Sequence, residues 1–139
     1  MTERFSKGDV VRYPYLWRWQ DELQREHGEK DRPVCIILAL RDEKSLTHML
    51  LLAISSKPPR EGQAALEIPK LELRRAKLTD HDCGWITVSE CNYDILEKSF
   101  HFDAGQRPLG KFSDVFLEEI RKAFVPFLAA GTAKIDRTK

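Results

Sequence analysis

Two apolar segments that lie close together in the chain constrain its fold more than any other feature. They are residues 34–40 (VCIILAL) and residues 48–54 (HMLLLAI). A continuous apolar run of this length is typical of a strand that is buried on both faces. We therefore predict that the two segments form central strands of one sheet, with the rest of the chain packed around them.

Other segments predict shorter elements. Segments with β-branched residues or with alternating apolar and polar residues are interpreted as further strands: residues 9–13, 65–68, 85–90 and 100–102. Residues 93–98 are interpreted as one or two helical turns. Residues 57–62 and 105–110 contain glycine and proline and are interpreted as a loop and a turn. Segment 14–31 is expected to be a long loop at the rim of the fold, or to include a short helix over residues 17–27.

The C-terminal segment predicts a helix over about residues 113–128. Ser113 is a candidate N-cap, and Asp114 places a negative charge in the first turn. Apolar residues recur at helical spacing and form a predicted core stripe: Phe116, Ile120, Ala123, Phe124, Phe127 and Leu128. Pro126 is expected to kink or shorten this helix, and Gly131 is expected to follow its end.

The order of these elements, with strands first and a helix last, predicts a mostly β (β+α) fold. We expect one domain over residues 1–139, with about five to seven short strands in a small, mostly antiparallel sheet or barrel and a C-terminal α-helix packed on it. The composition, 42% hydrophobic and 32% charged, is that of a folded domain. The net charge of +1 excludes a global basic field, so any contact with nucleic acid requires a local patch.

Several classes of protein are disfavoured by what the sequence lacks. No apolar run is long enough to span a membrane, and the first residues do not resemble a secretion signal. The three cysteines are an odd number at scattered spacing, which argues against a disulfide framework and for a cytoplasmic protein. The histidines do not have the spacing of metal ligands, and no phosphate-binding loop or nucleophile elbow is present. We predict no metal and no cofactor.

The polar residues that end the two apolar segments are the remaining candidates for chemistry. Arg32 precedes the first segment, and Ser55 and Ser56 follow the second. If the two strands pair, Arg32 and Ser55 lie near each other at one rim of the sheet. The planar guanidinium matches a phosphate, and a serine hydroxyl can donate to or accept from the same group. This pair therefore predicts a cradle for a phosphodiester.

Further residues are candidates for RNA binding. Trp17 and Trp19, in segment 14–31, offer flat faces on which bases can stack. Local positive charge would come from four residues: Arg12, Arg18, Lys30 and Lys57. Each candidate also has a structural interpretation. The arginines are then solvated, the serines serve the turn, and the tryptophans cover an edge of the core.

In the order and spacing of its motifs, the chain resembles the MazF/PemK family of toxin ribonucleases. The resemblance rests on GDVVRY (8–13), RPVCIIL (32–38) and LLLAISS (50–56), and it extends more loosely through GWITVSECNYDILEKSF and LGKFSDVFLEEIRKAF. It covers about residues 6–128. It implies an SH3-like barrel with a C-terminal helix, usually assembled as a homodimer. It also implies metal-independent cleavage of single-stranded RNA, including mRNA, and inhibition by a cognate antitoxin protein.

Carried over to this chain, the resemblance gives Arg32 the place of the family's catalytic arginine. Ser55 takes the place of its hydroxyl residue, which is usually threonine. The implied reaction is attack of the RNA 2′-hydroxyl on the adjacent phosphorus, with His27 and Glu29 as candidate general bases. Segment 14–31 is longer than is typical of the family, and Phe100 stands where members often have arginine or leucine.

Two other functions stay open at this point. One is a gyrase-directed toxin on the same fold, although members of that group end in a tryptophan-containing tail and this chain ends GTAKIDRTK. The other is a non-catalytic module that binds nucleic acid or protein through the same rim.

Overall fold

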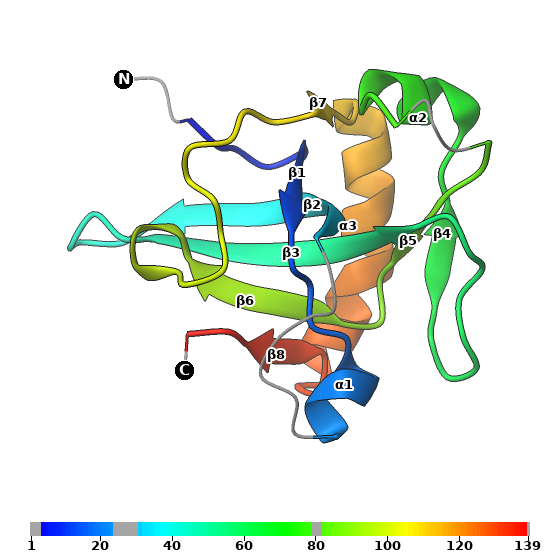
Figure 1. Cartoon of the computed structure of the whole chain (residues 1–139). Helices are drawn as coiled ribbons and strands as arrows, with labels where there is room; N and C mark the ends of the chain where they lie inside the picture. The colour runs from blue at the N-terminus through cyan, green and yellow to red at the C-terminus, as the bar shows by residue number, and fades with distance from the viewer. Residues whose placement is uncertain (1–3, 24–30, 79–81, 139) are drawn as a thin grey trace.

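The two apolar segments form the centre of one sheet, as the sequence predicts. Strand β2 (Arg32–Arg41) pairs antiparallel with β3 (Thr47–Ser55), and Val34 lies opposite Ala53 in this register. The structure, a computed structural model, describes residues 4–23, 31–78 and 82–138. Figure 1 shows β2 and β3 as the long strands on which the other elements are arranged.

Six shorter strands complete an eight-stranded sheet: β1 (Asp9–Tyr13), β4 (Ala65–Glu67), β5 (Trp85–Thr87), β6 (Cys91–Ile95), β7 (Gly110–Lys111) and β8 (Lys134–Asp136). The strand order is β4-β5-β3-β2-β1-β7, with β6 pairing both β3 and β8. All these pairs are antiparallel except β6 with β8, which is parallel. The predicted fold class is confirmed. Among the described residues, however, the sheet has eight strands rather than five to seven and does not close into a barrel.

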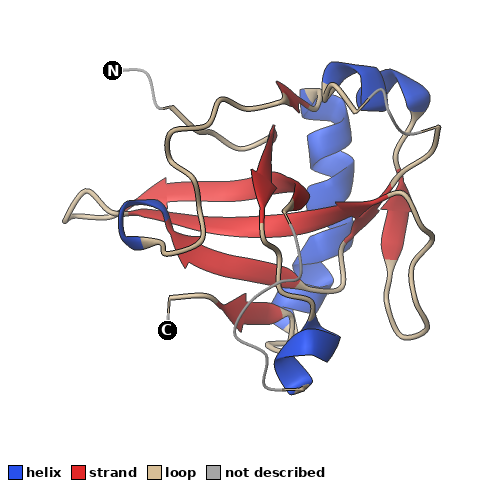
Figure 2. Ribbon diagram, viewed as in Figure 1, coloured by secondary structure: helices blue, strands red, loops and turns tan. Residues whose placement is uncertain are grey.

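The sheet separates two apolar clusters, because alternate residues of a strand point to opposite faces. One face packs against helix α3 (Asp114–Ala129) and includes Val10 of β1 and Cys35 of β2. The other face includes Val11 and the ring of Trp17. Figure 2 shows α3 crossing behind the sheet, whereas the chain that follows β1 runs over the near face.

Helix α3 confirms the predicted C-terminal helix almost to its bounds. The Ser113 hydroxyl accepts a hydrogen bond from the backbone N–H of Phe116, so the predicted N-cap is correct. Pro126 lies inside the helix, which continues to Ala129, so this proline does not shorten it. Phe127 is exposed and lies outside the core, contrary to the predicted stripe.

Two segments differ from their predictions. In residues 93–98 only one helical turn forms, the 3-10 turn η1 (Leu96–Lys98), because residues 93–95 belong to β6, which pairs with β3. Residues 100–102 do not form a strand, because the Phe100 side chain is exposed while Phe102 packs edge-on against Phe5. In segment 14–31, the described part contains α1 (Arg18–Glu22), and residues 24–30 lie outside the described residues.

A further helix, α2 (Lys70–Arg75), was not predicted, and Figure 1 shows it beside the N-terminal end of α3. Glu72 of α2 is buried and accepts hydrogen bonds from the backbone N–H and the hydroxyl of Ser113. Within the described ranges, every helix is too short or too polar to cross a lipid bilayer.

Candidate functional site

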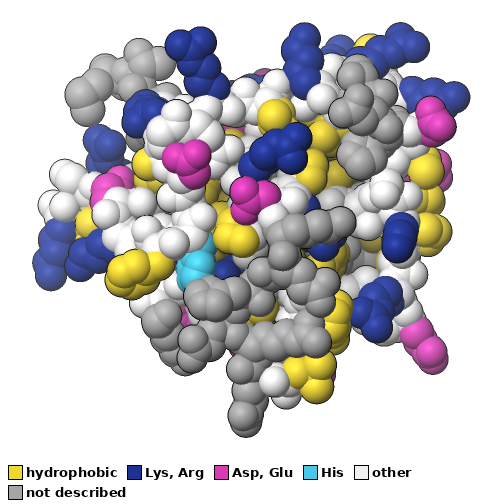
Figure 3. Space-filling view, viewed as in Figure 1, with side chains coloured by type: hydrophobic (Ala, Val, Ile, Leu, Met, Phe, Trp, Pro, Cys, Tyr) yellow, Lys and Arg dark blue, Asp and Glu magenta, His cyan; other side chains and the backbone are white. Residues whose placement is uncertain are grey.

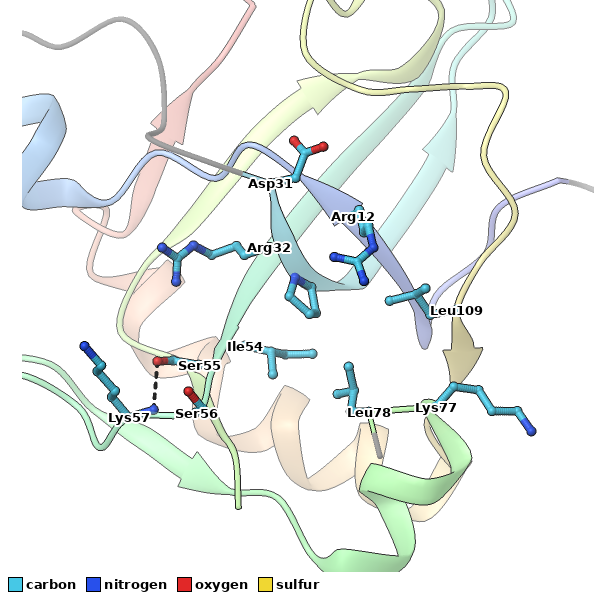
Figure 4. A pocket seen from close by; sticks show the side chains of 11 residues that line it. Arg12, Asp31, Arg32, Ile54, Ser55, Ser56, Lys57, Lys77, Leu78 and Leu109 are labelled. Carbon is cyan, nitrogen blue, oxygen red and sulfur yellow. Dashed lines mark hydrogen bonds between the residues drawn. The ribbon is translucent and has the colours of Figure 1, made fainter. Parts of the chain in front are cut away.

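A surface cavity lies where β2 begins and β3 ends, and we call it the first cavity (Figure 4). Its volume is about 370 Å³. Five of its lining residues were predicted for the site: Arg12, Arg32, Ser55, Ser56 and Lys57. The cavity also contains Lys77, Asp31 and the apolar side chains of Ile54, Leu78 and Leu109. The strand ends therefore come together at one rim, and they do so around an open space.

The register of the sheet explains why Arg32 and Ser55 lie at the same cavity. Val34 is opposite Ala53 in the β2–β3 pair, and two further residues along each strand bring Arg32 opposite Ser55. By strand alternation both side chains lie on the sheet face of Trp17, and each is half-buried. Figure 4 shows the Arg32 side chain extending to the side on which Ser55 lies.

The guanidinium of Arg32 packs on an aromatic ring. Its carbon Cζ lies 5.1 Å from the centroid of Trp17, within the range of a cation–π contact. Trp17 is only 8% exposed and meets the Tyr15 ring edge-on, with 5.0 Å between the centroids. Trp17 does not line the first cavity and contacts it through Arg32. Because so little of Trp17 is exposed, its structural interpretation as cover for the core also applies.

Buried polar side chains hold the segment that carries Trp17. The Leu16 backbone N–H donates to Asn92 Oδ1 at 2.8 Å, and Asn92 Nδ2 donates back to the Leu16 carbonyl at 2.8 Å. One residue earlier, the Tyr15 hydroxyl donates to Glu90 Oε1 at 3.2 Å. These partners are distant in sequence, so the pattern around residues 90–94 gave no signal of them.

The Ser55 hydroxyl stabilises a turn and still has a proton that it can donate to a ligand. Its Oγ accepts a hydrogen bond of 3.1 Å from the Lys57 backbone N–H, which is drawn in Figure 4. The structural interpretation of Ser55, as a residue that stabilises the turn, is therefore correct. A hydroxyl that accepts one hydrogen bond still has a proton to donate, so Ser55 can also donate to an anion in the first cavity.

The charge around the first cavity is locally positive. Four cationic side chains line it, from Arg12, Arg32, Lys57 and Lys77, against the single carboxylate of Asp31. Figure 3 shows lysine and arginine side chains dispersed over the viewed face rather than gathered in one field, as the net charge of +1 implies. The expected local patch is thus present at the first cavity, where a phosphate would meet several donors.

A second cavity, of about 390 Å³, adjoins the first and shares Ser55 and Lys57 with it. It is lined by both predicted tryptophans, by Pro58, Pro59, Gln63 and Thr87, and by Arg60. The Arg60 guanidinium carbon lies 4.6 Å from the centroid of the Trp19 ring. Trp19 is half-buried, so it offers the second cavity more surface than Trp17 does. Arg60 was not predicted as a site residue, because in the sequence it belongs to a proline-rich loop.

A third cavity, of about 230 Å³, lies between α1 and the turn at residues 60–63. Arg18 lines this cavity rather than the first one, so the structure does not bring it together with Arg32. Glu90 also lines it and is 3% exposed. Burial raises the pKa of Glu90, and hydrogen bonds from Arg18 and Tyr15 offset only part of that effect.

Some predicted residues cannot be placed. Lys30 and the two candidate bases, His27 and Glu29, lie outside the described residues. In the described part of the chain, no three histidine, cysteine, aspartate or glutamate side chains gather as a possible metal site.

We compared the chain with protein-family models, with curated proteins and with solved structures, and none of the three comparisons gives a significant match. The resemblance to the MazF/PemK family therefore stays a prediction from the sequence.

Proposed function

We propose that this chain is an endoribonuclease toxin that cleaves single-stranded RNA without a metal ion and is neutralised by a cognate antitoxin. One observation carries the proposal: Arg32 and Ser55 line the same cavity, together with three further cationic side chains. A phosphodiester in the first cavity would meet a guanidinium and a hydroxyl at once. These two groups match the phosphate's charge and its hydrogen-bonding oxygens.

The reaction needs only the substrate's own hydroxyl as the nucleophile. The 2′-oxygen forms a bond to the adjacent phosphorus while the bond from phosphorus to the 5′-oxygen of the next nucleotide breaks. A base takes the proton of the 2′-hydroxyl, and the departing 5′-oxygen gains a proton. The products are a 2′,3′-cyclic phosphate and a 5′-hydroxyl end.

In this reaction Arg32 has an electrostatic role. Negative charge grows on the phosphoryl oxygens in the transition state, and a guanidinium fixed nearby stabilises that charge without reorganising. The Trp17 ring fixes the guanidinium from one side. Ser55 donates a hydrogen bond to a phosphoryl oxygen and orients the phosphate for in-line attack.

The proposal extends to partners on the strength of the family resemblance. We expect a cytoplasmic homodimer, and an antitoxin segment that competes with RNA for the first and second cavities. Inhibitors of this kind are commonly acidic and partly disordered, and they fold onto a basic surface. Light scattering tests the assembly, and a monomeric mass at micromolar concentration would contradict the dimer.

The activity itself is tested with purified protein, single-stranded RNA and EDTA. We expect cleavage in EDTA with 2′,3′-cyclic phosphate ends, and no cleavage of DNA of the same sequence, because DNA lacks the 2′-hydroxyl. A requirement for magnesium or the appearance of 5′-phosphate ends would refute this mechanism. RNA binding without cleavage would instead favour the non-catalytic binding module.

A further inference from the structure

The three cavities adjoin one another in a row, because each shares lining residues with the next. The first cavity shares Ser55 and Lys57 with the second, and the second shares Trp19, Arg60 and Gln63 with the third. Single-stranded nucleic acid binds along tracks of this kind, with cations at the phosphates and flat side chains against the bases. If a phosphate occupies the first cavity, as the proposed function requires, we expect a base further along the same strand to lie in the third cavity, beyond Trp19.

The third cavity is lined by Glu90, which is buried, and by Arg18, which is half-buried, and each side chain has a hydrogen-bonding atom without a partner among the described residues. Glu90 accepts two hydrogen bonds, from the Tyr15 hydroxyl at 3.2 Å and the Arg18 backbone N–H at 3.0 Å, and both go to Oε1. Within the part of the chain that is described, Oε2 has no hydrogen-bond partner. Arg18 Nη2 is buried and likewise has no partner among the described residues. A buried donor without a partner calls for an explanation. Oε2 of Glu90 is not among the buried atoms that lack a partner, so it is accessible to a ligand in the third cavity.

The carboxylate of Glu90 and the guanidinium of Arg18 together match the hydrogen-bonding groups of guanine better than those of the other three bases. A carboxylate oxygen accepts from N–H groups, and guanine presents two adjacent ones, N1–H and the N2 amino group, on its Watson–Crick edge. A guanidinium donates to acceptors, and guanine presents O6 and N7 beside that edge. Uracil has a single N–H group on its Watson–Crick edge, and adenine has no second donor next to its amino group. Cytosine offers its N4 amino group alone to a carboxylate.

We propose that the third cavity is a guanine site, in which Glu90 accepts from the Watson–Crick N–H groups and Arg18 donates to O6 or N7. Single-stranded RNA is read in this way, by bases that leave the stack, lie against aromatic or arginine planes and hydrogen-bond through their edges. The Trp19 ring and the Arg60 guanidinium supply such planes at the boundary with the second cavity. The inference rests on the proposed binding of RNA in the first cavity.

The test measures binding separately from cleavage. Labelled 2′-O-methyl pentanucleotides lack the attacking hydroxyl, so they bind without being cut. Pentauridine is compared by fluorescence anisotropy with pentamers that carry one guanosine, adenosine or cytidine at each position in turn. We expect guanosine at one position to bind about tenfold tighter than uridine, the discrimination typical of a base read by paired hydrogen bonds.

The variant Glu90→Gln isolates the carboxylate. Glutamine keeps an oxygen that accepts from Tyr15 and Arg18, so thermal unfolding should change little, yet its amide replaces Oε2 with a donor that faces the guanine N–H groups. The guanosine preference should fall to within about twofold of uridine. The matched control is Glu61→Gln, because Glu61 is an exposed carboxylate on the same cavity. This control should keep the preference. If Glu90→Gln does not fold, Arg18→Gln tests the same site and should lose the preference too.

The outcomes separate the two proposals. A guanosine preference that depends on Glu90, without cleavage of unmodified RNA, supports the guanine site and contradicts the nuclease. Cleavage without any base preference, or a preference that survives both variants, overturns the guanine site alone. A Glu90-dependent preference for cytidine overturns the choice of base. If no pentamer binds, both proposals are wrong.

Discussion

The guanidinium of Arg32 lies against the ring of Trp17, with 5.1 Å from Cζ to the ring centroid. One of these residues begins β2, and the other precedes α1 in a segment held to β6 by Asn92. The contact thus connects the first cavity to the apolar cluster on the sheet face that includes Val11 and Trp17. It orients a flexible side chain whose head group would otherwise sample many rotamers, and so prepares it for a phosphate.

The first prediction concerns this contact. Trp17→Leu removes the aromatic face, and we expect the single-turnover cleavage rate to fall about 2- to 30-fold, which corresponds to a cation–π energy of about 0.5–2 kcal/mol. Trp17→Phe keeps an aromatic face and should retain most of the rate. Thermal unfolding of both variants must be recorded, because Trp17 is buried. Equal rates in Trp17→Leu and the wild type would show that the ring does not position Arg32.

The second prediction concerns Arg32 itself. Arg32→Ala should lower the cleavage rate on the order of a hundred-fold or more, the usual effect of removing one preorganised electrostatic contact. Its free energy of unfolding should change by no more than about 1 kcal/mol, because the residue is half-buried at a rim. Arg32→Lys keeps the charge but loses the planar pair of donors, so an intermediate rate is expected. Arg121→Ala, on the exposed face of α3, is the control and should cleave normally.

The third prediction concerns Glu72, which ties α2 to the start of α3. Burial raises the pKa of Glu72, but hydrogen bonds from the backbone and hydroxyl of Ser113 and the ion pair with Arg75 outweigh burial and lower it. Glu72→Gln should therefore reduce the free energy of unfolding by about 1–3 kcal/mol at neutral pH, measured in urea.

We also predict how the difference in the free energy of unfolding between the wild type and Glu72→Gln depends on pH. Because the pKa of Glu72 is lower in the folded chain than in the unfolded one, its stabilisation is complete above the unfolded value. It is lost as the pH falls from about 4.5, the ordinary value, through the folded pKa. The wild type and Glu72→Gln should become equally stable in that acidic range. A difference that stays constant with pH would show that the carboxylate charge is not involved.

The fourth prediction concerns Gly110, where β7 begins. A Cβ at this position would overlap the Arg75 carbonyl oxygen and lie 2.7 Å from the Ala76 carbonyl carbon, both backbone atoms. Gly110→Ala should therefore destabilise the chain by about 1–3 kcal/mol, as overpacking does. At Gly105 a Cβ would meet only an Asp103 side-chain oxygen, so Gly105→Ala should unfold at nearly the wild-type temperature. Similar unfolding temperatures for the two variants would contradict the close approach of α2 to β7.

Much of the fold could be predicted because its signals are local. The apolar runs of β2 and β3 identify central strands without reference to any other residue. The Ser113 cap and the apolar stripe likewise locate α3 within a residue or two. Arg32 and Ser55 could be brought together from sequence for the same reason, since pairing two known strands places their outer ends at one rim.

What only the tertiary structure decided depends on contacts between residues far apart in sequence. The polar residues Asn92 and Asp94 are fully buried in β6, because Leu16 and Tyr13 satisfy them from the other end of the chain. The sequence predicted no strand at Asn92 and only one or two helical turns from Tyr93 onward. The hydrogen bond of Leu16 to Asn92 also holds the segment that carries Trp17, whose ring packs against Arg32. Burying a polar group is costly unless a partner is supplied, and a linear sequence does not show which partner arrives. Packing therefore decided which of residues 14–23 enter the core and which line the cavities. The presence of an arginine and a serine at the rim, by contrast, follows from the sequence alone, because both residues end predicted strands.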